Sequence, residues 1–450
     1  MTNPQTGKTT ADWLAARLAG LQARDVPPSA FHAARRCLVD VLGCAAAGRA
    51  EPAVRTAQEW AGQVYASGTS AAWFAHAHFS PVAAAFVNAS AASILDLDDG
   101  HRAAAGHPGA AIIPAALAVG QALGASMEDI LLAIIAGYEA GVGCADLRTP
   151  AARANVATGR WSAIGVAAAV AKLNGHDVER TRHALTVAEA HAPNLLAADH
   201  SGFQGGHVKE GIPWSVVAGF GAADLAGLGF KGYDASLSNP GVYGERPAGA
   251  GSERFLIETT YFKRYACCRW THSAVDAAVD LMQRVPADAR VESVVIETFA
   301  RAATLPNHAQ PADVISAQFS LPFVVAAAVV HGADALLPLD PRLLRDEAVV
   351  RLARNIEVRV DPALDAMFPA KVPARVRIAT SHGASEQLVV SPLGDWDHPM
   401  SDEALVAKAL HLAGRGESAL VPASLLRGLL TGDVAPATLF AALAAPDGRA

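Results

Sequence analysis

The chain has few cysteines, and no two of them have the CxxC spacing. The five thiols are scattered over 450 residues, and no CxxC motif occurs among Cys37, Cys44, Cys144, Cys267 and Cys268. This pattern excludes a zinc ribbon and a CxxC redox centre. The odd, scattered set predicts a protein of the reducing cytoplasm.

Positive charge is also scarce. Lys and Arg total 36 against 43 Asp and Glu, which gives a net charge of -7 and a pI near 6.1. Proteins that bind nucleic acid need a basic face to neutralise phosphates, and this composition lacks one. We therefore expect no nucleic-acid partner, and any cationic site must be local.

Long apolar runs and nucleotide loops are missing as well. The longest uncharged run, residues 103–127, is broken by His107, Pro108 and Pro114, unlike a membrane span. The N-terminus contains Asp12 and no continuous apolar stretch, so we expect no signal peptide. No strand pattern leads into a GxGxxG or GxxxxGK[ST] loop, and no GxSxG elbow occurs. We predict no membrane partner.

Apolar residues are abundant, at 52% of the sequence against 18% charged. This balance suits a compact enzyme whose surface is partly hidden against another subunit. The chain, at 450 residues, is longer than the size at which a single hydrophobic core stops growing, so we expect two domains.

Helical spacing of apolar residues extends from about residue 11 to residue 225, with many alanines that permit close packing. Ser126, followed by two acids, predicts a helix start. Asn174 and Gly175 predict the end of another helix, which begins near Ser162, and Asp177 opens the next.

In the last third of the chain, the sequence pattern changes from helical to strand-like. Runs of β-branched residues predict strands, and a hairpin is predicted to turn at His382 and Gly383. Ser401 then caps a helix, and we expect the C-terminus to fold back onto the helical part. The strand runs are 291–300, 355–361 and 374–381.

The segment DLDDGHRAAAGHPGAAIIPAALAVG, from Asp96 to Gly120, gathers three carboxylates and two histidines between helical runs. Pro108 in the first turn of the next helix leaves His107 beside a helix N-terminus, where a substrate carboxylate is favoured. The alternative interpretation is that Asp98 and Asp99 only cap helices in a solvated loop.

Two further interpretations of this segment are weaker. The letters DxDD resemble a terpene cyclase motif, but nothing else in the sequence supports an isoprenoid pocket. The Asp and His cluster, with His76 and His78, contains ligand types that suit Mn, Fe or Zn. HAH in an alanine-rich stretch is more often structural, and we predict no metal and no cofactor.

Lys209 stands at a helix entrance in HVKEGIPW, where it either faces a site or pairs with Glu210 at the surface. His191, His200 and His207 add titratable groups nearby, with no common face assigned.

The stretch YFKRYACCRWTH packs Lys263, Arg264, Arg269 and His272 into a cationic patch that suits carboxylates. Its paired thiols, Cys267 and Cys268, are either nucleophiles or buried packing residues, and we favour packing.

Taken together, these segments resemble the MmgE/PrpD family, whose members include 2-methylcitrate dehydratase, cis-aconitate decarboxylase and iminodisuccinate epimerase. DLDDGHRAAAGHPG is similar to the family's DFDDxH...HPS, KRYACCRWTH to KPYPCCRYTH, and SAQFSLPFVVA at 316–326 to DAQFSLPYAVA. Three motifs in this order make the resemblance run nearly end to end.

The resemblance implies a mainly α fold without metal or organic cofactor, usually a homodimer. A large helical domain, residues 1–268 and 396–450, would carry both termini, and residues 269–395 would form an inserted α+β lid. The implied catalytic residues are Asp96, His107, Lys209 and Lys263. The implied substrate-binding residues are Arg269, His272, Asp99 and His101.

Several positions depart from the family pattern. A threonine common four places after the first Asp is Gly100 here, an expected histidine aligns with Val156, and a tyrosine is replaced by Phe323. KEGIPW also replaces KxLHxG after Lys209. These departures indicate a specialised branch.

Removal of a proton alpha to a carboxylate requires preorganised cations, for which Lys209, Lys263 and Arg269 are candidates. His107, oriented by Asp96, would act as base or acid. Three hypotheses follow: a hydro-lyase acting on a small di- or tricarboxylic acid, an epimerase of the iminodisuccinate type, and a non-catalytic carboxylate-binding protein. We place the lyase first.

Overall fold

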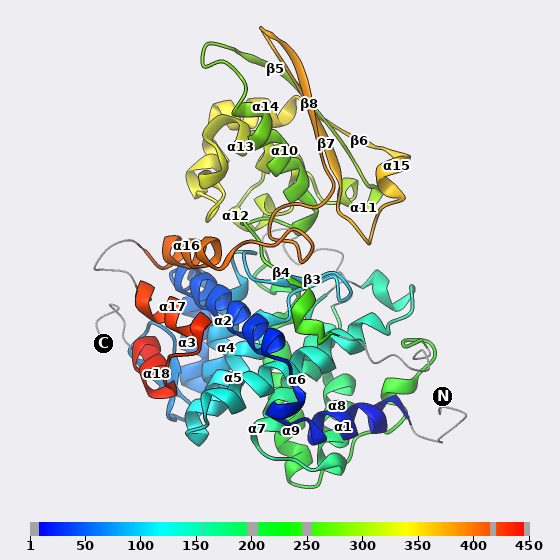
Figure 1. Cartoon of the computed structure of the whole chain (residues 1–450), viewed down its shortest axis with the longest axis vertical. Coiled ribbons are helices and arrows are strands. Elements are labelled where there is room, and N and C mark those ends of the chain that lie inside the picture. The colour runs from blue at the N-terminus through cyan, green and yellow to red at the C-terminus, as the bar shows by residue number, and fades with distance from the viewer. Residues whose placement is uncertain (1–8, 156, 196–205, 245–253, 415–419, 445–450) are drawn as a thin grey trace.

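The computed structural model describes residues 9–155, 157–195, 206–244, 254–414 and 420–444. Figure 1 shows a large helical part and, at one end of it, a smaller part that contains a sheet. The predicted mainly α fold is confirmed. Val156 and His200 lie outside the described residues.

The helical body comprises α1 to α9 and α16 to α18. Helices α6 and α7 approach each other closely because Gly137, Gly141 and Gly165 carry no side chains. A Cβ on Gly141 would lie 3.2 Å from Cα of Gly165, and a Cβ on Gly137 would lie 2.9 Å from its carbonyl oxygen. The first nine helices are α1 Thr10–Gly20, α2 Pro28–Gly48, α3 Pro52–Val64, α4 Pro81–Ser93, α5 Gly109–Leu123, α6 Met127–Asp146, α7 Gly159–Leu173, α8 Val178–His191 and α9 Ile212–Gly227.

The predicted caps are confirmed. The Ser126 hydroxyl accepts a hydrogen bond from the backbone N–H of Asp129 at 3.1 Å, at the start of α6. The Asp177 carboxylate caps α8 in the same way. Helix α7 ends at the expected Asn174 but begins at Gly159, earlier than predicted. Local capping signals therefore located these helices to within a few residues.

The smaller part, which we expected to form a lid and call the lid below, comprises α10 to α15 with a four-stranded sheet in the order β6-β5-β7-β8. β5 and β6 are parallel, and the other pairs are antiparallel. The predicted hairpin is confirmed, since Thr380 pairs with Gly383. The lid elements are α10 His272–Met282, β5 Val291–Thr298, α11 Ala300–Ala303, α12 Val314–Ala317, α13 Leu321–His331, α14 Glu347–Arg354, β6 Ile356–Val360, α15 Pro362–Asp365, β7 Ala374–Thr380 and β8 Gly383–Val389.

The chain then returns to the helical body. A Cβ on Gly43 of α2 would lie 2.7 Å from Cα of Ala409, so only a glycine allows α16 to pack this closely. The ammonium group of Lys408 lies 2.6 Å from the carboxylate of Asp40, and both residues are buried. The domain boundaries after residues 268 and 395 stay a prediction. The last helices are α16 Asp402–Ala413, α17 Ala423–Thr431 and α18 Pro436–Ala444.

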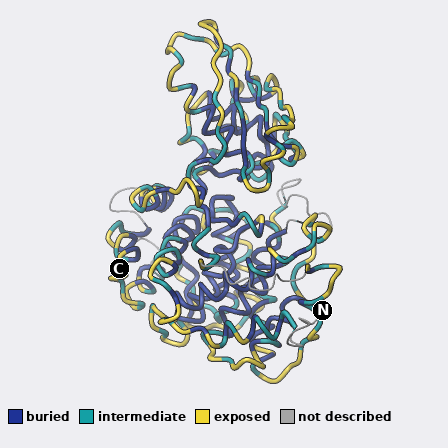
Figure 2. Tube along the Cα trace, turned by 45° about the vertical axis from the view of Figure 1, so that its right-hand side comes forward, coloured by how far each residue is buried: buried dark blue, intermediate teal, exposed yellow. Residues whose placement is uncertain are grey.

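Buried residues fill the interior of both the helical body and the lid, and exposed residues lie on the outside (Figure 2). Within the described ranges, no helix combines the length and apolar character needed to cross a membrane. Two short strand pairs lie in the helical body. They are β1 Ser70–Ala72 with β2 Ala77–Phe79, and β3 Gly100–His101 with β4 Thr260–Tyr261.

Candidate active site

Asp96 is the centre of the site. It follows α4, and its backbone lies in the left-handed region, with φ 55°. A non-glycine residue there is strained by about 1–3 kcal/mol, and such strain clusters at functional sites. The side chain is buried, with 1% exposure.

Two buried lysines hold this carboxylate. Lys263 Nζ lies 2.6 Å from Oδ2 of Asp96, and Lys209 Nζ donates a hydrogen bond to Oδ1. Burial alone would raise the pKa of Asp96, but the two ammonium groups outweigh it and hold that pKa well below its usual range. Burial would likewise lower the pKa of Lys209, but Asp96 reverses this and raises it. Two cations therefore share one ionised carboxylate.

Lys209 reaches Asp96 from a strained turn. Lys209, Glu210 and Gly211 have φ values of 41°, 55° and 71° in succession, just before α9. Glu210 accepts a hydrogen bond from the Thr158 hydroxyl at 2.6 Å. The interpretation of Lys209 as a surface lysine paired with Glu210 is therefore wrong.

His107 lies against three aspartates. Its Nε2 is 3.7 Å from Oδ1 of Asp96, and its Nδ1 is 3.3 Å from Oδ2 of Asp98 and 3.1 Å from the carbonyl of Asp99. The expectation that Asp96 orients His107 needs correction, because the closer contacts come from Asp98 and Asp99. Burial would lower the pKa of His107, but the Asp98 carboxylate outweighs it and raises that pKa.

Asp99 lies behind the site. It accepts a hydrogen bond from the Gly109 N–H at 2.9 Å, and the Tyr138 hydroxyl also donates to it. The helix N-terminus expected to receive a substrate carboxylate is therefore capped by Asp99. The capping interpretation holds for this residue, although it is fully buried rather than solvated. Burial raises the pKa of Asp99 to about 7.

The predicted cationic patch is divided between different carboxylates. Arg269 Nη2 lies 3.0 Å from Oδ2 of Asp395, and its guanidinium sits 4.6 Å from the centre of the Tyr261 ring. His272 Nδ1 lies 3.4 Å from Arg269 Nη1. Burial, with Arg269 and Lys263 nearby, holds the pKa of His272 well below its ordinary value, so this imidazole is neutral. Arg264 pairs with Asp276 instead.

His101 contacts a neighbouring turn rather than Asp96. Its Nε2 lies 2.8 Å from the Thr259 hydroxyl and 3.0 Å from the Leu256 carbonyl. Burial lowers its pKa to about 4, which keeps the ring neutral. Its predicted role in substrate binding stays a prediction.

Four other histidines and the two adjacent thiols make no hydrogen bond to Asp96 among the described residues. His76, His78 and His207 are exposed, whereas His191 contacts the Val187 carbonyl of its own helix. In the described part of the chain, no group of three or more His, Cys, Asp or Glu residues is arranged to hold a metal ion. Burial raises the pKa of Cys267 and Cys268 to about 12, so both thiols stay protonated, as expected of packing residues.

Tyr261 is a site residue that the sequence did not reveal. β3 pairs with β4 so that Gly100 faces Tyr261, and a Cβ on Gly100 would lie 2.3 Å from the phenol oxygen. The space left by the missing side chain at position 100 is therefore filled by a phenol from about 160 residues away. A threonine at position 100 would collide with it.

The SAQFSLP motif contacts the same cluster from the side of the lid. The Gln318 side-chain amide donates to the Ile94 carbonyl at 3.2 Å, and the Phe319 ring centre lies 5.5 Å from Lys209 Nζ. Phe323 is buried in α13. Both parts of the molecule thus contribute to the surroundings of Asp96 and Lys209.

Comparisons with known proteins agree with this arrangement. The MmgE/PrpD N-terminal domain matches residues 12–244, and the MmgE/PrpD C-terminal domain matches residues 265–419. A cis-aconitate decarboxylase from Aspergillus terreus is 26% identical over 88% of this chain and 87% of its own length. The human cis-aconitate decarboxylase is 25% identical over 62% of this chain and 61% of its own length. These matches indicate an enzyme.

Proposed function

The chain belongs to the MmgE/PrpD family, and from this premise we propose that it is a lyase that removes a proton next to a carboxylate of a small di- or tricarboxylic acid. Relatives named cis-aconitate decarboxylase support a lyase, because a decarboxylase is a lyase. They also support the substrate class, because cis-aconitate is a small tricarboxylate. The same family membership supports a homodimer, whose mass would be twice the 46.3 kDa of one chain.

The observation that carries this proposal is the pair of buried ammonium groups, Lys209 and Lys263, that share Asp96 beside His107. When the alpha proton leaves, its electron pair adds negative charge to a carboxylate that is already an anion. Fixed cations in a buried site stabilise that charge without having to reorganise. Simple anion binding would not need the titratable imidazole next to them.

His107 is the proposed general base. Because Asp98 raises its pKa, the imidazole becomes neutral at a higher pH than an ordinary histidine does. In a dehydration, His107 takes the alpha proton, the C–H electron pair forms the new C=C bond, and the hydroxyl leaves as water after protonation by a second acid. The product is an alkene.

An epimerase is the second candidate. Gly100 has no side chain, and Phe323 is buried and apolar, so two positions that carry polar groups elsewhere in the family lack them here. Proton exchange without a leaving group needs fewer polar contacts than dehydration. In this case the proton would return to the opposite face of the same carbon.

Proton NMR in deuterated water tests these alternatives. EDTA-treated enzyme is mixed with citrate-like, tartrate-like and amino-linked dicarboxylates. An alkene signal is expected for the lyase, whereas deuterium at the alpha carbon without an alkene would indicate the epimerase. Binding without exchange would favour the third hypothesis, a non-catalytic carboxylate-binding protein. Activity that needs added metal would contradict the predicted independence from metal.

Variants identify the residues involved. His107→Asn should lower the rate by roughly 10²–10⁴-fold, because a positioned base typically contributes that much. Lys263→Gln should also lower it strongly, whereas Lys231→Gln, at an exposed lysine, should not. Equal rates for Lys263→Gln and Lys231→Gln would contradict the proposed role of Lys263.

A further inference from the structure

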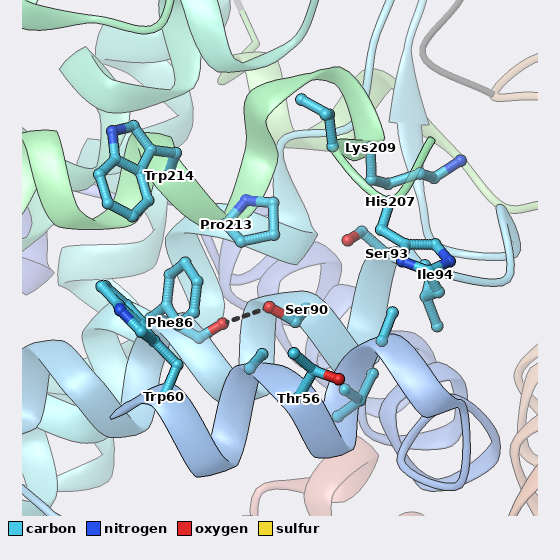
Figure 3. A pocket seen from close by; sticks show the side chains of 14 residues that line it. Thr56, Trp60, Phe86, Ser90, Ser93, Ile94, His207, Lys209, Pro213 and Trp214 are labelled. Carbon is cyan, nitrogen blue, oxygen red and sulfur yellow. Dashed lines mark hydrogen bonds between the residues drawn. The ribbon is translucent and has the colours of Figure 1, made fainter. Parts of the chain in front are cut away.

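A cavity of about 530 Å³ lies between α3, α4 and the start of α9. Its walls are mostly apolar and include Trp60, Phe86 and Trp214, together with small side chains of α3 and α4 (Figure 3). The cavity extends from these aromatic rings to Ile94 and Lys209.

The aromatic end is a continuous apolar wall. The Trp60 ring centre lies 5.7 Å from that of Trp214 and 5.1 Å from that of Phe86. Trp214 is 51% exposed in the single chain, so the rest of the chain leaves much of this apolar surface uncovered. Aromatic side chains contribute large apolar areas to binding sites, usually with few polar groups beside them.

The other end of the cavity adjoins the proposed active site. Ile94 precedes Asp96 by two residues, and Lys209 donates a hydrogen bond to the Asp96 carboxylate. Figure 3 shows the Lys209 side chain on the far side of the cavity from Trp60 and Trp214, with its ammonium end turned away from them. The cavity is therefore apolar at its outer end, and its inner end is lined by the side chain of Lys209, whose ammonium group binds Asp96.

We propose that this cavity binds an alkyl or aryl arm of the substrate, so that the substrate class is a carboxylic acid with an apolar substituent. The inference rests on the proposed function, because it assigns the carboxylate end to Lys209 and its neighbours. Pockets of roughly 300–1,000 Å³ take ligands much larger than a four-carbon diacid. A bare diacid would leave the aromatic wall in contact with water.

Binding of matched acids tests the proposal. Succinate, 2-butylsuccinate and 2-benzylsuccinate share the same diacid and differ only in the arm. Each buried methylene tightens binding by roughly fourfold, so we expect the butyl and benzyl acids to bind at least about tenfold more tightly than succinate. Calorimetry gives the Kd. The butyl and benzyl acids are called the armed acids below, and quenching of tryptophan fluorescence by them reports on Trp60 and Trp214. Equal Kd values for all three acids would overturn the proposal.

A filling variant tests the location. Thr56→Trp introduces bulk from the wall of the cavity, at an exposed position of α3, where it should not disturb the core. It should reduce the affinity for the armed acids to that for succinate. Gln63→Trp, exposed on the same helix but outside the cavity lining, is the matched control and should keep the tenfold preference. An unchanged preference in Thr56→Trp, with a native circular dichroism spectrum, would place the arm elsewhere.

Two further readouts separate this inference from the proposed function. If succinate exchanges its alpha protons with deuterium and the arm adds no affinity, the inference fails and the proposed function stands. If the armed acids bind tightly with no exchange in any acid, the cavity assignment stands and the proposed chemistry fails.

Sedimentation should give the same mass for Thr56→Trp and Gln63→Trp. A dimer that only Thr56→Trp dissociates would assign the cavity to a second copy of the chain and overturn the proposal.

Discussion

Asp98 is a buried carboxylate whose two oxygens have no hydrogen-bond partner within the described residues. Its Oδ2 lies 3.3 Å from Nδ1 of His107, on the side of the ring opposite to Nε2. A buried polar group without a hydrogen-bond partner costs folding free energy. Its position beside the proposed base makes it a positioning residue for that imidazole.

Asp98→Asn should move the acid limb of the proton-exchange rate to lower pH. The Asp98 carboxylate raises the pKa of His107, so without it burial lowers that pKa and the neutral base persists in more acidic solution. The maximal rate should fall by at least about tenfold, because the imidazole loses the carboxylate beside its Nδ1 and keeps only the Asp99 carbonyl there. The measurement is the exchange rate by NMR from pH 5 to pH 9. A lower rate with an unshifted profile would reduce Asp98 to a structural role.

Asp99→Asn should change how thermal stability depends on pH. The folded protein keeps Asp99 protonated up to a pKa of about 7, whereas an unfolded chain releases this proton near pH 4. The stability that this group contributes is therefore fully present below about pH 4 and is lost as pH rises to about 7. The Tm of the wild type minus that of Asp99→Asn should fall between pH 5 and pH 7 and then level off. Glu59→Gln, at an exposed position, should give a flat difference.

Sequence motifs identified Asp96, His107, Lys209 and Lys263, and the structure brings these four together. Motifs did not reveal which aspartate orients His107, because that depends on the rotation of one imidazole ring. Tyr261 was missed for a different reason. Its contact with Gly100 depends on a strand pair that joins segments far apart in the chain.

At the scale of elements, the helices of the body were predictable because their signals are local. Ser126, Asp177 and Ser401 cap the helices that follow them, and each cap needs only a hydrogen bond three residues away. The turn that presents Lys209 was not predictable. Its three successive left-handed residues are held partly by the bond between Glu210 and Thr158, which lie 52 residues apart in the chain.

At the scale of the whole molecule, Asp395 joins the helical body to the lid. Its carboxylate lies 2.5 Å from Arg102, which follows β3, and 3.0 Å from Arg269, which precedes α10. Asp395 is fully buried, and Arg269 is nearly so. One carboxylate thus neutralises a guanidinium from each part.

Asp395→Asn should destabilise the fold by about 3–5 kcal/mol, because it leaves two largely buried guanidinium groups without their shared anion. The measurement is the Tm by calorimetry. Asp397→Asn is the control, since Asp397 lies 3.4 Å from the same Arg102 but is partly exposed, at 20%, and also pairs with Lys371 at the surface, so its loss should cost less. Because Arg269 also lies beside Tyr261 and His272, Asp395→Asn should in addition weaken acid binding relative to Asp397→Asn. Equal melting temperatures for the two variants would mean that Asp395 does not couple the two parts.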